Sequence, residues 1–399
     1  MPSHPHWLND QRVRVYSLLV VVITGIVASA WIVSALPSLV DRGGKPIGYD
    51  FITFWSAARL ALTGAPEAVF NAAAMGAMHR LAVPALGDIL FLWHYPPAYL
   101  LLVLPLGLLP YPAALVAFSG ATAALWAGLI RALFRAPRAW LVAAATPAGI
   151  INFLDGQNGF LTAGLAGFAL LQLDRRPRLA GMLIGLLAIK PHLAALFPIA
   201  LIASRRWQTT VAAAVTAILF TAISVVVFGT PTALAFLRDL PTLSAIVDGG
   251  GLPWGQMPSP YVLMLSLHGA AVVAGLAQAA AAFGAALCVW RAWRRPGGAV
   301  EAKAAVLLAA SLLVSPYLFT YDLTWGALAI AFLVIAGLRD GFAAGERDLL
   351  FSAWLAPFVL APLYWLLGVQ FGCVVCIMLL ILGMRRLRRF PVTVMAVAA

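Results

Sequence analysis

Short apolar runs alternate with arginine clusters in residues 159–206, GFLTAGLAGFALLQLDRRPRLAGMLIGLLAIKPHLAALFPIALIASRR. Basic residues mark the cytoplasmic ends of membrane helices, so the arginines at 175–178 and at 205–206 both predict a cytoplasmic turn. The chain between these two turns must therefore cross the membrane and return. Pro191 divides this stretch, because proline cannot donate a backbone hydrogen bond and disfavours helix at the residue before it. We expect a pair of short helices that meet there.

The composition excludes a water-soluble protein. Hydrophobic residues make up 63% of the 399 residues and charged residues 10%, whereas a soluble domain has about 45–50% apolar and about 25% charged residues. The same figures exclude a disordered chain and a fibrous repeat. We therefore expect a polytopic membrane protein, in which the formal net charge of +12 reflects cytoplasmic loops rather than nucleic-acid binding.

Twelve apolar runs predict twelve membrane crossings. The runs lie at about 16–40, 112–130, 139–153, 159–173, 179–190, 191–203, 208–228, 269–290, 302–316, 321–338, 349–367 and 369–384. Basic clusters precede the first run and separate successive pairs; they are Arg12 and Arg14, Arg131, Arg135 and Arg138, Arg175, Arg176 and Arg178, Arg205 and Arg206, Arg291, Arg294 and Arg295, Arg339 and Arg347, and Arg385, Arg386, Arg388 and Arg389. This distribution places both termini in the cytoplasm. The predicted fold is an all-α bundle, a single integral domain of the inner membrane over residues 1–399.

Two alternatives remain open. One tilted helix over 179–203 would merge two crossings, invert the rest of the chain and place the C-terminal arginines outside. At the N-terminus, Ala28, Ser29 and Ala30 resemble a signal-peptide cleavage site, but the apolar run continues to Val40. Because a signal core needs fewer apolar residues, we favour an uncut membrane anchor.

Two long segments are expected on the outer side of the membrane, and function concentrates in such loops. The first, 41–111, contains two stretches that predict interfacial helices. Residues 51–62 have an apolar face opposite a row of threonine, serine and arginine, and residues 97–109 are apolar but short and bounded by prolines. The second segment, 229–267, is rich in glycine and is expected to be a mobile loop that covers a site.

Eight of the 14 acidic residues are expected outside, at or near helix ends: Asp41, Asp50, Glu67, Asp88, Asp155, Asp239, Asp248 and Asp322. Ionisable groups near the hydrocarbon are costly, so each invites a functional interpretation or a charge partner. Asp50 directly precedes the predicted helix 51–62. It is therefore either the cap of that helix or a general base, and it can be both.

Further polar residues are expected at the same outer face as substrate-binding groups. They are His94, Tyr95, Gln157, Asn158, Lys190, His192, Tyr321 and Asp322. Simpler explanations remain open for seven of them: a rigid or plain turn for the first four, snorkelling for Lys190, and a helix cap at Tyr321 and Asp322. Against these, amide groups can bind sugar hydroxyls, and a lysine at the outer end of a membrane helix can bind an anion.

No metal or cofactor is predicted. The sequence contains no HExxH, no paired CxxC and no run of adjacent aspartates. Cys288, Cys373 and Cys376 lie in apolar runs, which favours packing over a disulfide or a four-ligand zinc site. The glycines at 249–251 lack the strand, helix and lysine of a phosphate-binding loop.

Seven stretches carry a family resemblance: YDFITFWSAARLALTG (49–64), YPP (95–97), LPLGLLP (104–110), GQNG (156–159), AGMLIGLLAIKP (180–191), RRW (205–207) and SPY (315–317). In this order they resemble the polyprenyl-phosphate-dependent membrane glycosyltransferases of the GT-C superfamily. More narrowly they resemble family 87, which includes the bacterial α-1,2-mannosyltransferases of phosphatidylinositol mannoside synthesis. The resemblance covers the first half of the chain well and the second half thinly.

The resemblance implies that Asp50 is the general base and that a donor phosphate binds near Lys190. The implied reaction moves mannose or another hexose from a polyprenyl-phosphate donor to a lipid or glycan acceptor at the periplasmic face. One base and direct displacement imply inversion at the anomeric carbon. Family members often carry a histidine a few residues after the SerPro pair, where this chain has Tyr321 and Asp322. This departure puts a histidine role there in doubt and is consistent with a different donor sugar.

A twelve-helix secondary transporter, or a flippase of envelope glycolipid precursors, is the alternative from another class. Transporters usually have repeated halves and ionisable residues near the midplane. This chain has unequal halves, one long first loop and polar groups gathered at one face. Other GT-C activities, such as glycosylation of lipid A or of protein, also remain open.

Overall fold

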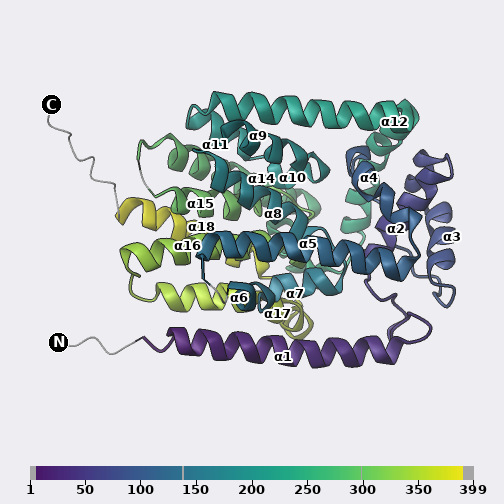
Figure 1. Ribbon diagram of the computed structural model, residues 1–399, viewed down its shortest axis with the longest axis horizontal. Helices are drawn as coiled ribbons and strands as arrows, with labels where there is room; N and C mark the ends of the chain where they lie inside the picture. Colours follow the sequence, from purple (N-terminus) through teal and green to yellow (C-terminus); the bar gives the residue numbers. More distant parts are fainter. Residues whose placement is uncertain (1–5, 137–138, 298, 390–399) are drawn as a thin grey trace. The chain divides into compact units, whose positions relative to one another are not determined.

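The computed structural model describes residues 6–136, 139–297 and 299–389, and within these ranges the chain forms helices and one isolated β-bridge, between Val40 and Pro46 (Figure 1). The α-helices are α1 (Asp10–Ala35), α2 (Phe51–Leu62), α3 (Ala72–Ala82), α4 (Pro97–Val103), α5 (Tyr111–Phe134), α6 (Ala139–Ala144), α7 (Pro147–Leu154), α8 (Gly159–Gln172), α9 (Pro177–Gly185), α10 (Pro191–Ala194), α11 (Phe197–Ala203), α12 (Trp207–Asp248), α13 (Pro260–Ser266), α14 (Ala271–Arg294), α15 (Val300–Ser311), α16 (Thr324–Asp340), α17 (Glu346–Leu367) and α18 (Gly372–Arg389). The 3-10 helices are η1 (Pro66–Phe70), η2 (Leu104–Leu108), η3 (Leu186–Ile189), η4 (Trp254–Gln256) and η5 (Thr320–Leu323). Arg138, one of the predicted cytoplasmic arginines, lies outside the described residues.

Six helices of the described chain are long and apolar enough to cross a membrane. They are α1, α5, α12, α14, α17 and the continuous segment of η5 and α16. Shorter apolar helices accompany them, including α2, α8 and the pair of α10 and α11. The prediction of an all-helical membrane protein is confirmed, and each of the twelve predicted apolar runs contains helix. The number of crossings stays a prediction.

The helix break predicted at Pro191 is present. Helix η3 ends at Ile189, Lys190 has a non-helical backbone (φ −143°, ψ 68°), and α10 begins at Pro191. Proline at the first position of α10 is well tolerated, because the amide that it lacks would have no partner within the helix. The segment 179–203 is therefore not one continuous helix, and whether it crosses the membrane once or twice stays a prediction.

The chain divides into two compact units. The first comprises residues 1–164 and 219–245, and the second comprises residues 165–218 and 246–399. Helix α12 contributes residues to both and is interrupted at Gly229, whose backbone is non-helical (φ 80°, ψ 159°). This interruption lies where the sequence predicts the end of an apolar run, at 228.

Aromatic side chains around α2 form the core of the first unit. Helix α2 packs against η1, α3, α4, η2 and α5. The ring of Phe54 meets those of Trp93, Tyr95, Tyr99 and Phe118 edge to face, with centroids 5.1 to 6.3 Å apart. Such pairs add to the stabilisation that comes from burying their area. Helix α2 is thus held rigidly from several sides.

The predicted helix over 51–62 is present, but its polar row does not face water. Thr53 and Ser56 are buried. Ser56 Oγ lies 2.8 Å from Nδ1 of His79 on α3, and Arg59 donates to the carbonyl of Gly107 at 3.1 Å. An exposed polar face, as expected of an interfacial helix, is therefore wrong for Thr53 and Ser56. Neighbouring segments of the same loop supply the hydrogen-bond partners that water would otherwise supply.

In the second unit, two glycines let α9 approach α12 closely. A methyl group at Gly181 would lie 2.5 Å from the carbonyl oxygen of Thr209, and one at Gly185 would lie 2.7 Å from that of Ala213. Small residues at such crossings are typical of helix pairs in membranes, where close packing replaces the hydrophobic effect. Helices α15 and α16 form the buried centre of this unit.

The prediction of a loop over 229–267 is wrong for most of its length. Helix α12 resumes after Gly229 and continues to Asp248, and η4 and α13 follow. Pro231 lies close to the new helix start, where proline is tolerated. Near the end of the segment, Val247 is fully buried in a hydrophobic cluster with Met257 and Val262. The glycines that suggested mobility occupy only the short turn between α12 and η4.

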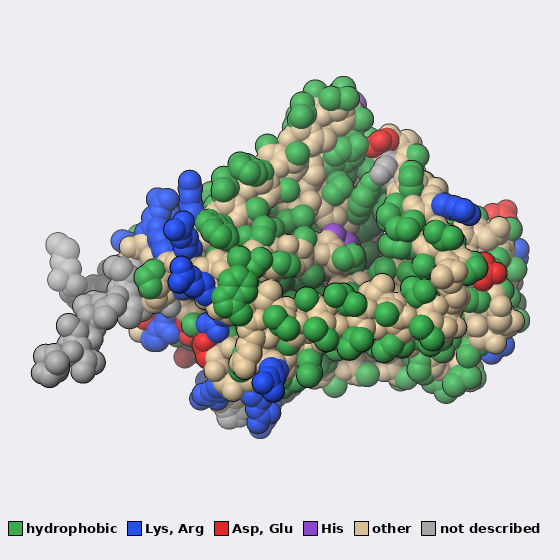
Figure 2. Space-filling view, turned by 90° about the horizontal axis from the view of Figure 1, so that it is seen from above, with side chains coloured by type: hydrophobic (Ala, Val, Ile, Leu, Met, Phe, Trp, Pro, Cys, Tyr) green, Lys and Arg blue, Asp and Glu red, His purple; other side chains and the backbone are tan. Residues whose placement is uncertain are grey.

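Apolar side chains cover much of the surface seen in Figure 2. Val33 on α1 is 68% exposed, and Val226 on α12 is 84% exposed. Exposed apolar area of this extent is unusual in a soluble monomer but suits contact with lipid. The surface therefore agrees with the composition.

Candidate active site

Asp50 occupies the N-cap position of α2 without acting as a side-chain cap. Its backbone is helical (φ −69°, ψ −19°), and its side chain makes no cap hydrogen bond to the helix. Its Oδ2 instead accepts a hydrogen bond of 2.8 Å from Nε2 of Gln157. The carboxylate is therefore directed away from the helix backbone. A side-chain cap of α2, the simpler explanation for Asp50, is not present.

A strained turn sets the direction of Asp50. Gly48 (φ 84°) and Tyr49 (φ 34°) both have positive φ, which is uncommon for a tyrosine. Gly48 must be small, because a methyl group there would lie 2.8 Å from the side chain of Leu115. Tyr111 donates a hydrogen bond to the carbonyl of Ile47, just before the turn. Packing therefore compensates for the strain beside Asp50.

The side chain of Tyr49 is held by a network around Asp41. Tyr49 Oη donates to Asp41 at 2.8 Å, Trp31 Nε1 donates to the same oxygen at 3.2 Å, and the two rings stack at 5.6 Å. Burial acts to raise the pKa of Asp41, but hydrogen bonds from the backbone of Lys45, Tyr49, Trp31 and the backbone of Gly43 outweigh it and lower the pKa. Asp41 is therefore a stable anionic anchor for the turn.

Gln157 connects Asp50 to Tyr95. The Gln157 amide donates through Nε2 to Asp50, while its Oε1 accepts from Tyr95 Oη at 3.2 Å and from the Asn158 backbone N–H at 3.1 Å. Gln157 and Asn158 are buried. Gln157, predicted as a substrate-binding group, thus orients the carboxylate of Asp50, and Tyr95, predicted in the same role, holds Gln157.

His94 contacts the far half of α12 through its ring. Its Nδ1 lies 2.9 Å from Oδ2 of Asp239, and both side chains are mostly buried. The sequence predicts both residues at the outer face but does not pair them. The contact links the loop before α4 to the part of α12 that lies where the sequence predicted the second outer loop.

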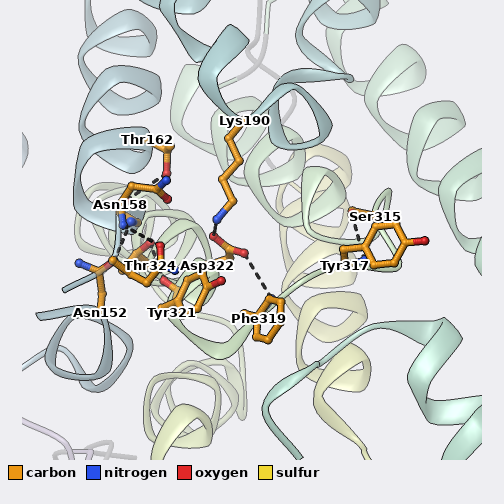
Figure 3. Close-up of polar contacts among 12 residues, drawn as sticks. Asn152, Asn158, Thr162, Lys190, Ser315, Tyr317, Phe319, Tyr321, Asp322 and Thr324 are labelled. Atoms are coloured by element: carbon orange, nitrogen blue, oxygen red, sulfur yellow. Dashed lines mark hydrogen bonds and ion pairs between the residues drawn. The ribbon is translucent and has the colours of Figure 1, made fainter. Parts of the chain in front are cut away.

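Lys190 and Asp322 form the central polar contact of the second unit (Figure 3). Lys190 Nζ lies 2.6 Å from Asp322 Oδ1, and the side chains are 5% and 0% exposed. The ammonium also lies 4.8 Å from the ring centroid of Tyr321, within cation–π range. A lysine this deeply buried does not snorkel, so snorkelling does not explain Lys190.

Asp322 serves a second role in its own segment. Its Oδ2 accepts a hydrogen bond of 3.3 Å from the backbone N–H of Phe319, just before the start of η5. The rings of Phe319 and Tyr321 stack with centroids 5.3 Å apart. Cap and charge partner are therefore combined in one side chain.

Six of the predicted site residues form two networks, one within each unit. Asp50, Tyr95 and Gln157 share one network in the first unit, and Lys190, Tyr321 and Asp322 share another in the second. His192 follows Pro191 on α10, and its Nε2 is buried with no hydrogen-bond partner in the described part of the chain. In the described residues no group of three or more metal-ligating side chains occurs.

Asp155 is the residue that the sequence prediction left out of the site. It ends α7 and stands two residues before Gln157. Burial and the charge of Asp50 raise the pKa of Asp155 well above its ordinary value, and the charge of Lys45 opposes them. The signal was available, because the sequence predicts Asp155 to be an outer acid and places it directly before the GQNG stretch.

Comparison with known proteins gives one family. The model of glycosyltransferase family 87 matches residues 93–316, which include Tyr95, Gln157 and Lys190 but neither Asp50 nor Asp322. No curated protein and no solved structure matches the chain significantly.

Proposed function

The chain belongs to glycosyltransferase family 87, and we propose that it moves mannose or another hexose from a polyprenyl-phosphate donor to a lipid or glycan acceptor. It is a membrane glycosyltransferase, which sets aside the transporter and flippase alternatives. The proposed location is the periplasmic face of the inner membrane, because a polyprenyl-linked donor cannot leave the bilayer and presents its labile bond at the interface.

The observation that carries this proposal is the environment of Asp50. Asp50 is partly exposed, and its carboxylate makes no hydrogen bond that caps α2. Gln157 orients this carboxylate. A general base needs an accessible carboxylate whose direction is fixed by its neighbours. The strained turn at Tyr49 supplies this fixed direction.

The proposed reaction is one direct displacement. A carboxylate oxygen of Asp50 accepts the proton of the acceptor hydroxyl while the oxygen of that hydroxyl bonds to the anomeric carbon. The bond from the anomeric carbon to the phosphate oxygen breaks, and the polyprenyl phosphate leaves with the electron pair. Attack opposite to the leaving group inverts the anomeric configuration, and proton acceptance by a positioned base contributes about 10² to 10⁴ in rate.

Lys190 is the proposed partner of the donor phosphate. A cation offsets the negative charge that develops as the phosphate departs. Because the ammonium already contacts Asp322 at 2.6 Å, the phosphate must compete with a carboxylate for the same charge. His192, with its unpartnered Nε2, is a second candidate donor of a hydrogen bond in this segment.

Transfer by the purified full-length chain tests the proposal. The protein in nanodiscs is incubated with radiolabelled polyprenyl-phosphate mannose, polyprenyl-phosphate glucose or a nucleotide sugar, together with extracted envelope lipids and glycans as acceptors. We expect transfer from a polyprenyl-phosphate hexose only, and a product anomer opposite to that of the donor. Transfer from the nucleotide sugar would overturn the donor class, and retained configuration would overturn direct displacement.

A further inference from the structure

The turn that carries Gln157 directly follows Asp155 and packs against the start of α2 at Gly156. Gly156, between them, has a positive φ of 60° and packs against the Asp50 turn. A methyl group at Gly156 would lie 2.5 Å from Cβ of Phe51 and 3.0 Å from the carbonyl oxygen of Gly48. Such distances leave no room for any residue but glycine. The residues on both sides of Gly156 are therefore held close to Asp50.

The charged and titratable groups that face Asp155 come from one neighbouring segment. Asp50 raises the proton affinity of Asp155, Lys45 lowers it, and the phenol of Tyr49 is itself affected by Asp155. Tyr49 in turn donates its hydroxyl hydrogen to Asp41 and cannot neutralise Asp155. Lys45 is exposed and lies 5.1 Å from the Tyr49 ring centroid, so water weakens its influence.

We propose that Asp155 is a second proton-binding group of the Asp50 site, and that the two carboxyl groups hold one proton between them at neutral pH. Two nearby carboxylates that both lose their protons repel each other, so one stays protonated. Gln157 donates its N–H to Asp50 at 2.8 Å, which stabilises the ionised form there and leaves the proton on Asp155. This inference rests on the proposed role of Asp50.

Asp155 then acts as a positioning residue through Asp50. While it is protonated, only one negative charge lies beside the bond that breaks, and Asp50 is the ionised group that accepts the acceptor proton. After transfer both carboxyl groups are protonated, and Asp50 returns its proton to water before the next turnover. Loss of the Asp155 proton at higher pH would place a second anion next to the departing phosphate and slow transfer.

Infrared difference spectroscopy of the full-length protein in nanodiscs tests the pair without an activity assay. The C=O stretch of a protonated carboxyl group should be present in the unsubstituted protein at neutral pH and be absent from Asp155→Asn. Asp50→Asn should move the titration midpoint of this band to lower pH, and Lys45→Met should move it to higher pH. Asp174→Asn, an exposed acid elsewhere, serves as the matched control. An unchanged band in Asp155→Asn, or a midpoint that Asp50→Asn does not move, would overturn the inference.

The pH dependence of kcat/KM gives an independent readout. Asparagine mimics a permanently protonated Asp155, so the pH profile of kcat/KM for Asp155→Asn should lack the alkaline decline of the unsubstituted protein. Loss of activity in folded Asp155→Asn with the alkaline decline intact would contradict the inference. If Asp50→Asn kept full activity but still shifted the midpoint of the infrared band, the proposed base would be rejected. The inference that the two carboxyl groups interact would remain.

Discussion

Lys190 and Asp322, 132 residues apart in the sequence, form a buried ion pair with their charged atoms 2.6 Å apart. Both side chains are almost completely shielded. Breaking a buried pair by removing one partner leaves an uncompensated charge, which is more damaging than removing both. This relationship determines how any variant of Lys190 has to be interpreted.

The first prediction separates the stability of this pair from donor binding. Lys190→Gln should lower the free energy of unfolding by about 3–5 kcal/mol, because Asp322 stays buried without its partner. Combining it with Asp322→Asn removes the remaining charge and should recover most of that loss. Denaturant unfolding in detergent measures both.

The double variant then isolates the function of Lys190. If Lys190 binds the donor phosphate, the Lys190→Gln and Asp322→Asn combination should bind a polyprenyl-phosphate sugar about 1–3 kcal/mol more weakly than Asp322→Asn alone. Lys190→Arg should retain more binding, because the charge survives. Equal donor affinities in nanodiscs would remove Lys190 from the donor site.

A second prediction concerns the contact of α9 with α12. Gly185→Ala places a methyl group 2.5 Å from Cβ of Thr216 and 2.7 Å from the carbonyl oxygen of Ala213, so the two helices must separate. We expect a loss of about 1–3 kcal/mol in unfolding free energy. Gly284→Ala on α14 is the matched control, because its new methyl group meets nothing within 4 Å. Equal effects of the two substitutions would show that the close approach is unimportant.

A third prediction concerns pH and His79. Burial is the main cause that lowers the pKa of His79 to about 4, Arg80 lowers it further, and the hydrogen bond with Phe91 opposes them. Because the unfolded chain takes up this proton near pH 6.5 and the folded chain does not, stability should fall as the pH drops below about 6.5. Between pH 6.5 and 5 the loss should be about 2 kcal/mol.

His79→Gln should remove this part of the pH dependence, while His268→Gln, at an exposed position, should keep it. Unfolding free energies at both pH values provide the comparison. If the pH dependence of the unfolding free energy persisted in His79→Gln, groups other than His79 would have to cause it.

A fourth prediction concerns topology. Thr63 and Ala85 are exposed in the first predicted outer segment, and Ala344 is exposed in the turn between α16 and α17. Single cysteines at Thr63 and Ala85 in a cysteine-free background should react with an impermeant maleimide in intact cells, and one at Ala344 should react only after the membrane is opened. Labelling of Ala344 in intact cells would contradict the predicted orientation.

Local features of the sequence predicted local structure well. Asp50 before a helix at 51–62, the break at Lys190 and Pro191, and the end of an apolar run near Gly229 all depend on residues close in the chain. Proline and glycine act through their own backbone, so their effects do not need knowledge of the fold. The same holds for the apolar runs, whose length is set by the bilayer.

Partners distant in the chain could not be predicted. His94 meets Asp239 across 145 residues, and Ser56 meets His79 on another helix. A pattern within one segment cannot identify such a partner, because the residue that covers each side chain comes from elsewhere in the chain. Gln157 was recognised as a candidate, but whether its amide would meet a sugar or Asp50 depends on how the two turns stack at Gly48 and Gly156.

The turnover of Asp50→Asn tests the central claim most directly. Asparagine keeps the shape of the side chain and an acceptor for Gln157 but cannot take the acceptor proton. Purified Asp50→Asn should bind the polyprenyl-phosphate sugar, unfold like the unsubstituted protein and transfer sugar about 10² to 10⁴ times more slowly. Near-normal transfer by this variant would contradict the account and move the base to another group.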